Sequence, residues 1–260
     1  MISRLTRRTL AMGALTCAVA GCTQVPSGSS GGQPTDTGSA ARSENCRTPG
    51  ELVTFDKVGQ AKVGYEVTGN LTSMRADPAF LTILAAWADE WTKASGLGAI
   101  TTIWSYGAYT DKCNSFHQVG RAFDIARIEH AKGTVTCRFD TWGPGTSSQL
   151  RTYWRLAASL HRRFAYTICY PYNAEHHNHI HVDNAVNDQS ATTFDATSTV
   201  QVQLVQHVCR HVFGLDGPTD GVWSEATRNA LRRVQRSSGI TTPIGDPAGW
   251  DAFLTAAIRG

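Results

Sequence analysis

Histidines and aspartates of the kind that bind metal ions gather in two short segments of the chain. His117 and Asp124 are separated by six residues in the first segment. The second segment reads HHNHIHVD, from His176 to Asp183, and has four histidines within six positions. Imidazole nitrogens and carboxylate oxygens are common zinc ligands. The two segments together therefore predict a metal site.

The second segment also has the pattern of a β-strand. Side chains alternate between the two faces of a strand, so His179, His181 and Asp183 are expected on one face. Three ligands drawn from separate segments leave a fourth position open to water, which is typical of catalytic zinc. A histidine-rich surface tract that binds metal loosely is the alternative. The distant pair of His117 and Asp124 argues against it.

These ligands must be positioned by a folded domain, which we predict over residues 46–196. Asp77 and Pro78 are residues typical of the start of a helix, and Gly96 is typical of a helix end. A second helix is predicted over 148–163, and strands are predicted over 99–106, 121–128, 165–169 and 179–184. Helices and strands that do not alternate strictly favour an α+β fold, with a small antiparallel sheet and flanking helices.

Residues 197–260 are predicted to form a second domain, a C-terminal three-helix bundle. Apolar residues recur at helical spacing in three stretches. The first runs from Val200 to Val212, the second follows an N-cap at Ser224, and the third follows an N-cap at Asp246. A core of this size is marginal, so docking or a disulfide at Cys209 is expected to support it.

The first 21 residues have the pattern of an export signal. Three arginines precede an apolar run, Leu10–Ala20, that is too short to span a membrane. The small residues before Cys22 resemble a bacterial lipobox, which implies cleavage after Gly21 and a lipid on Cys22. An ordinary secretory signal with a chance cysteine is the alternative, and both the Sec and the twin-arginine routes remain open. Residues 22–45, rich in Ser, Gly and Thr, predict a flexible linker.

The charge and the cysteines follow from this division. The 24 basic and 21 acidic residues give a net charge of +3, and the three arginines of the signal account for all of it. The balance gives no reason to expect a nucleic-acid partner. An exported protein keeps disulfides, so its five later cysteines predict two bridges and one free thiol. These cysteines are Cys46, Cys113, Cys137, Cys169 and Cys209.

The two metal-binding segments resemble those of known peptidases. Residues 115–124 match the S-x-H-x-x-G-x-A-x-D motif of D-alanyl-D-alanine metallopeptidases at every fixed position. The H-x-x-H-x-H pattern, followed by Asp183, is similar to penicillin-insensitive murein endopeptidases and bacterial extensin-like C-terminal domains, over about residues 46–187. The resemblance implies Zn²⁺ as the cofactor, with His117, Asp124 and His181 as its ligands. Zinc activates water and polarises an amide carbonyl.

The chain departs from those peptidases in two places. Many of them have a Glu or Asp three residues before the last ligand, where this chain has Asn178. The resemblance then gives the role of the base to His179 or His176, with Glu175 a weaker candidate. The arginine that usually precedes the motif is missing as well. Recognition of an oxyanion or a carboxylate is expected to fall to Lys112 or to a tyrosine.

The C-terminal segment is similar to the three-helix peptidoglycan-binding domains of cell-wall hydrolases. The likeness rests on the run DGPTDGVW from Asp216 to Trp223 and on the helices that flank it. Gly217 and Gly221 are expected in turns, and the side chains of Val222 and Trp223 are expected to pack in the domain. A generic three-helix bundle is the alternative.

Together these features predict an exported, zinc-dependent peptidoglycan peptidase, either a murein endopeptidase or a D,D-carboxypeptidase. It would be a lipoprotein on the cell membrane, facing the cell wall and touching the membrane by its lipid anchor only. The competing hypothesis is a non-catalytic peptidoglycan-binding lipoprotein with a structural or vestigial zinc site. A plant-type extensin role is not expected, because the chain has no Pro-rich repeats.

Overall fold

The fold is that of a computed structural model, which describes residues 49–112, 115–143, 145–184 and 193–260. All of these residues belong to one compact unit, Asp36–Gly260. The predicted signal, the predicted lipidation site at Cys22 and the predicted linker to residue 45 lie outside the described residues. In the described part of the chain, no helix combines the length and the apolar character that a membrane span requires.

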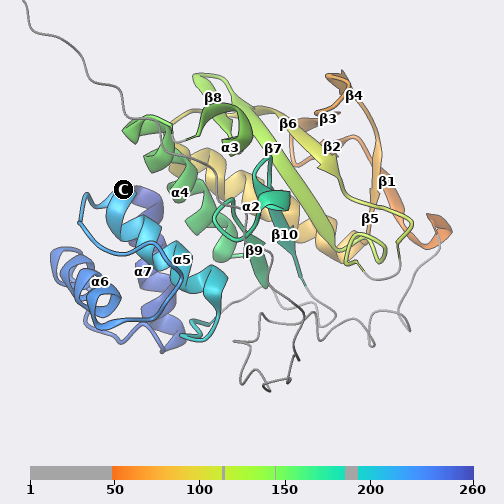
Figure 1. The fold of residues 1–260 in the computed structure, drawn as a ribbon. Helices are drawn as coiled ribbons and strands as arrows, with labels where there is room; N and C mark the ends of the chain where they lie inside the picture. The colour runs from red at the N-terminus through yellow and green to blue at the C-terminus, as the bar shows by residue number, and fades with distance from the viewer. Residues whose placement is uncertain (1–48, 113–114, 144, 185–192) are drawn as a thin grey trace, which may run out of the picture. The chain divides into compact units, whose positions relative to one another are not determined.

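The described chain has a mixed α+β fold (Figure 1). Eight strands form one sheet in the order β2-β3-β6-β7-β10-β9, with β4 beside β3 and β8 beside β7. These strands are β2 (Lys57–Val58), β3 (Ala61–Tyr65), β4 (Asn70–Leu71), β6 (Ile100–Gly107), β7 (Ala122–His130), β8 (Gly133–Thr136), β9 (Tyr166–Ile168) and β10 (Ile180–Asp183). Strands β1 (Val53–Phe55) and β5 (Met74–Ala76) form a separate antiparallel pair.

The helices lie between and after these strands in the chain. The α-helices are α2 (Pro78–Ser95), α3 (Phe139–Trp142), α4 (Ser147–His161), α5 (Thr199–His207), α6 (Glu225–Ser237) and α7 (Pro247–Arg259). Two 3₁₀ helices, η1 (Pro49–Glu51) and η2 (Ala174–His176), and one π-helix, η3 (Val208–Val212), complete the set.

The predicted strands are all present, within a residue or two at each end. The predicted antiparallel sheet needs one correction, because β3 pairs with β6 in parallel, with Lys62 opposite Thr102. The chain between these two strands includes α2, and a crossover of this kind returns the second strand in the direction of the first. The five strands before α2 were not predicted, since they are two to five residues long and too short to show a periodic pattern.

Local capping sets the ends of α2 as predicted. The side chain of Asp77 accepts hydrogen bonds from the backbone N–H groups of Ala79 and Phe80, at 2.9 and 3.1 Å. Gly96 ends the helix with φ +76°, a conformation that glycine adopts without a steric cost. The helix buries one face that includes Trp87 and Trp91, and so covers the core beside the sheet.

Helix α4 contacts α2, the sheet and the C-terminal helices (Figure 1). Trp154 of α4 stacks on His207 of α5, with ring centroids 4.2 Å apart. His161, at the end of α4, meets Trp250 of α7 edge to face. Both tryptophans are buried in the same hydrophobic cluster as the sheet. The division into domains at residues 196 and 197 stays a prediction, but the two segments share apolar packing.

The turn before α6 is built around Gln206. Its side-chain amide donates to Asp220, Thr227 and the carbonyl of Val222, at 2.8 to 3.1 Å. Its carbonyl accepts from the N–H of Gly221 at 2.8 Å, so this motif glycine holds a turn as expected. The prediction that Val222 packs is wrong, since the residue is 58% exposed.

The expectation of two disulfides and one free thiol is wrong. Cys137, Cys169 and Cys209 are free and buried, which leaves at most one bridge among the five cysteines. Cys46 and Cys113 lie outside the described residues. The suggested bridge at Cys209 is also wrong, because this thiol packs in the apolar core, where a free cysteine behaves as a small hydrophobic side chain.

Candidate metal centre

Strand pairing brings the two metal-binding segments together. Strand β7 lies between β6 and β10. Asp124 of β7 is directly opposite His181 of β10 on one side and opposite Gly107 of β6 on the other. The antiparallel register therefore makes neighbours of residues that are 57 positions apart in the sequence.

The loop before β7 positions His117 and explains two fixed residues of the motif. The hydroxyl of Ser115 accepts a hydrogen bond from the backbone N–H of His117 at 3.2 Å. Gly120 has φ +70°, and a Cβ atom there would lie 2.7 Å from the backbone nitrogen of Asp77. That nitrogen donates to the carbonyl of Gly120 at 2.8 Å. Only glycine fits this close approach of two backbones.

The predicted ligands converge at one point. One oxygen of Asp124 lies 3.2 Å from Nε2 of His117, and the other lies 2.8 Å from Nδ1 of His181. One ligand atom from each residue can be chosen so that all three lie within 4.8 Å of one another. The three side chains are only 12 to 17% exposed. Two imidazoles and a carboxylate in this arrangement can hold a divalent metal ion.

The second ring nitrogen of each predicted histidine ligand also has a partner. Nδ1 of His117 donates to the backbone carbonyl of Ala108 at 3.1 Å. Nε2 of His181 donates to the buried carboxylate of Asp183 at 3.0 Å. Each ring is therefore fixed with its other nitrogen toward Asp124, as metal-binding histidines usually are. A metal ion fits this donor set.

The charges of the cluster favour a bound cation. Burial alone would raise the pKa of Asp124, but the charge and hydrogen bond of His117, together with His181, hold that pKa well below the ordinary value. Burial would lower the pKa of His181, yet its bonds to Asp124 and Asp183 raise it to about 10. In the absence of metal the ring is an imidazolium between two carboxylates. A divalent cation would replace its Nδ1 proton.

Two further histidines, both predicted as bases, face the same cluster. Nε2 of His179 lies 3.4 Å from Asp124, and the ring of His176 lies 5.1 Å from the ring of His179. Burial lowers the pKa of His179, and it lowers the pKa of His176 to about 4, so both rings are neutral at pH 7. A neutral ring in this position can accept a proton.

Each of these two histidines is oriented by an asparagine. Nδ1 of His179 donates to the side-chain oxygen of Asn178 at 2.6 Å, and Nδ1 of His176 donates to that of Asn173 at 2.6 Å. The proton is therefore on Nδ1 in both rings, and Nε2 is the basic atom. Asn178, which takes the place of the acid in the peptidase motif that the sequence resembles, here sets the tautomer of His179.

A tyrosine packs next to His179, and an arginine lies near the tyrosine ring. The ring of Tyr106 lies 6.0 Å from that of His179, and its hydroxyl is hydrogen-bonded to Asn178. The guanidinium of Arg138 lies 5.9 Å from the centre of the Tyr106 ring and pairs with Glu66 and Asp140. Burial raises the pKa of Tyr106, so its hydroxyl stays protonated at neutral pH.

Other residues that the sequence singled out lie away from the cluster. His177 packs its ring against Phe139, at 5.5 Å between centroids. Glu175 and Lys112 are exposed, and no contact ties either side chain to the described ligands. The roles of Asn173 and of the Ala108 carbonyl were missed. A backbone acceptor has no signature in sequence, whereas the spacing of Asn173 before His176 could have signalled a cap.

Comparison with known proteins gives a family match over part of the chain. The family described as Extensin-like protein C-terminus, which is bacterial, matches residues 85–193. The matched range contains His117, Asp124 and His181, so the predicted likeness to bacterial extensin-like domains is confirmed there. No curated protein and no solved structure is similar enough to the chain to count as a match.

Proposed function

We propose that the chain is an exported zinc-dependent peptidoglycan peptidase that cleaves a stem-peptide or cross-link amide. The observation that carries the proposal is the pair of fixed imidazoles at Asp124. His117 and His181 each have one nitrogen tied to an acceptor and the other directed at the carboxylate. This is how a catalytic zinc site with three protein ligands is built.

The residues divide the chemistry between binding a metal ion and moving a proton. His117, Asp124 and His181 would hold Zn²⁺, which supplies a Lewis acid and lowers the pKa of bound water towards ~7. His179 is the nearer base, since its Nε2 lies 3.4 Å from Asp124. It would take a proton from water and give it to the leaving amine. Asn178 keeps that nitrogen free of its own proton.

Tyr106 favours electrostatic assistance at the same place. The tyrosine hydroxyl is protonated and hydrogen-bonded to Asn178, and the tyrosine ring packs against the ring of His179. The hydroxyl can therefore donate a hydrogen bond to an oxygen on which charge develops. Arg138 lies near the face of that ring and is held there by Glu66 and Asp140, so its role is to position the ring. This assigns to a tyrosine part of the role of the missing motif arginine. The exposed Lys112 has no comparable contact.

We further propose that residues 197–260 form a three-helix peptidoglycan-binding domain, and that Cys22 is lipidated at the cell membrane. The hydrogen bonds of the buried Gln206 with Asp220, Gly221 and Thr227 support the first part, because they give the motif residues a structural role. A binding domain attached to a hydrolase raises its effective concentration on an insoluble polymer.

The test is digestion of purified murein sacculi by the mature, zinc-loaded protein. We expect new amino termini, and the mass of the released muropeptides identifies the bond that was cut. His179→Ala should abolish release while zinc remains bound. The matched control is His177→Gln, which changes a neighbouring histidine outside the cluster and should keep activity.

The competing function is a non-catalytic wall-binding lipoprotein. It predicts that the zinc-loaded wild type binds sacculi but releases no amino termini from them. That result would reject the peptidase proposal and leave the metal site with a structural role.

A further inference from the structure

A large pocket opens at the end of β6, the strand that pairs with β7. Its volume is about 620 Å³, within the range of small-ligand sites. Its walls come from the end of β3, from β4 and β5, and from residues 107–109 at the end of β6. Because β3 and β6 are parallel, their carboxyl ends meet at one edge of the sheet, and the pocket lies at that edge.

One short segment belongs both to the pocket and to the metal centre. Gly107 and Ala108 line the pocket. Gly107 is also the partner of Asp124 across β6 and β7, and the carbonyl of Ala108 accepts the hydrogen bond of His117. A ligand that occupies the pocket therefore lies against the segment that holds two of the metal ligands.

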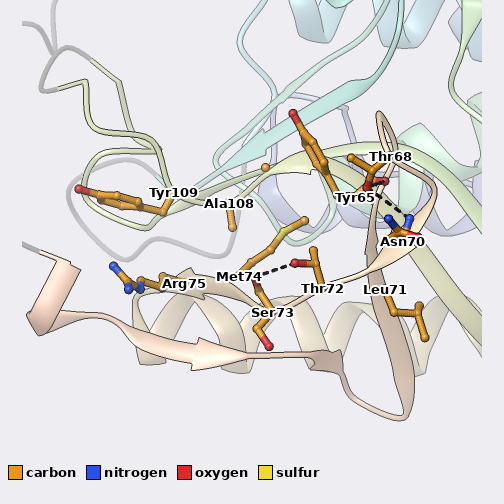
Figure 2. Close-up of a pocket in the computed structure, with 11 residues that line it drawn as sticks. Tyr65, Thr68, Asn70, Leu71, Thr72, Ser73, Met74, Arg75, Ala108 and Tyr109 are labelled. Atoms are coloured by element: carbon orange, nitrogen blue, oxygen red, sulfur yellow. Dashed lines mark hydrogen bonds between the residues drawn. The ribbon is translucent and has the colours of Figure 1, made fainter.

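The lining of the pocket has a distinct chemistry. Most of its polar side chains are neutral hydroxyls or amides, with Tyr65, Asn70 and Tyr109 among them. Arg75 is the one charged side chain in the lining, and Figure 2 shows its guanidinium beneath Tyr109 at one end of the pocket. Among the described residues, no ion pair involves Arg75. Its charge is therefore available to a ligand.

We infer that this pocket binds the substrate next to the metal centre, with Arg75 binding a carboxylate of the peptide. The inference rests on the proposed function and names the part of the substrate that is recognised. A guanidinium binds a carboxylate through two parallel hydrogen bonds, and the neutral walls suit the amide groups of the rest of the chain. Arg75 comes from β5, which precedes α2, so it occupies a different position from the arginine expected before the motif.

The experiment is a titration of the zinc-loaded full chain with synthetic stem peptides. All proteins carry His179→Ala, so that binding is measured without turnover. The probes are a pentapeptide ending in D-alanyl-D-alanine and a set of derivatives, each with one carboxylate converted to a carboxamide. Arg75→Gln is compared with Arg75→Lys and with Lys132→Ala, which removes an exposed cation in the β7–β8 turn.

We expect Arg75→Gln to weaken binding of the free-acid peptide about 10- to 100-fold. One carboxamide derivative should bind the parent and the Arg75→Gln variant equally weakly, which identifies the carboxylate. Arg75→Lys should retain part of the affinity, because it keeps the charge without the planar fork. Lys132→Ala should bind as the parent does.

Two failures are distinguishable. If Arg75→Gln binds every peptide as tightly as the parent, the inference is overturned even where the wild type cleaves sacculi. If the wild type cleaves nothing but the peptide still binds through Arg75, the inference stands and the peptidase proposal falls.

Discussion

Nε2 of His181 lies 3.0 Å from the carboxylate of Asp183, two residues further along the same strand. The two side chains share one face of β10, as the alternation of a strand requires. The carboxylate fixes the ring so that Nδ1 faces Asp124. Partners of this kind orient a metal ligand and raise its basicity.

We therefore expect Asp183→Asn to weaken zinc binding about 10- to 100-fold. The substitution keeps the shape and one acceptor oxygen but removes the charge that the imidazole faces. Competition with a chromogenic zinc chelator measures the affinity. Asp56→Asn is the control, because Asp56 is exposed in the turn between β1 and β2. Equal affinity of both variants would show that Asp183 has no part in metal binding.

The two asparagines allow the base to be identified. Asn178→Ala should lower kcat about 10- to 100-fold with little change in KM, because His179 loses the acceptor that sets its tautomer. Asn173→Ala removes the corresponding acceptor from His176. If His179 is the base, only the first variant loses activity on sacculi at unchanged zinc content. The opposite order would transfer the role to His176.

Acid should destabilise the contact between α4 and the C-terminal helices. Burial lowers the pKa of His161 and of His207 to about 3, below the value near 6.5 of an unfolded chain. As the pH falls below about 6.5 the unfolded chain takes up protons first, so stability is full above this pH and is lost progressively towards pH 3. Each histidine contributes a slope of about 1.4 kcal/mol per pH unit.

Urea unfolding between pH 7.5 and 4.5 measures this slope. His207→Phe retains an aromatic ring against Trp154 and removes one titrating group, so its free energy of unfolding should depend less on pH than that of the wild type. Parallel curves for the two proteins would mean that His207 is not buried in its neutral form.

The three buried thiols should resist alkylation in the native protein. Burial raises the pKa of Cys169 and of Cys209 to about 12 and raises that of Cys137 as well, and the thiolate is the reactive form. Iodoacetamide at pH 8 should leave all three unmodified, and the same treatment in urea without reductant should label all three. Mass spectrometry reads both states. Protection that persists in urea would indicate a disulfide.

The sequence predicted what depends on neighbours in the chain. The cap at Asp77 and the end at Gly96 are local signals, so α2 was placed to the residue. The resemblance of two motifs to those of known peptidases implied His117, Asp124 and His181 as ligands, and the register of β7 and β10 brings Asp124 and His181 together. Arg75 could not be predicted in this way. Its place beside Tyr109 depends on how β5 lies against the segment after β6.

The disulfides also could not be predicted from the sequence alone. The number of cysteines and an exported location favour bridges, but neither says which side chains the core encloses. Helix packing buries Cys209 among apolar residues, and the strands and Tyr153 enclose Cys169. Whether a cysteine forms a disulfide depends on the distance between two backbones, and that distance follows from the tertiary fold.

The pairing of Asp124 with His181 also bears on how the chain folds. A divalent ion held by both residues would tie β7 to β10 across 57 residues of sequence, a contact that only the native chain makes. Such an ion shifts the folding equilibrium by mass action, by about 2.7 kcal/mol at a hundredfold excess over its dissociation constant. The metal ion would then link the two strands in the native state. A chain exported unfolded would gain part of its folding free energy from the metal ion that it binds after export.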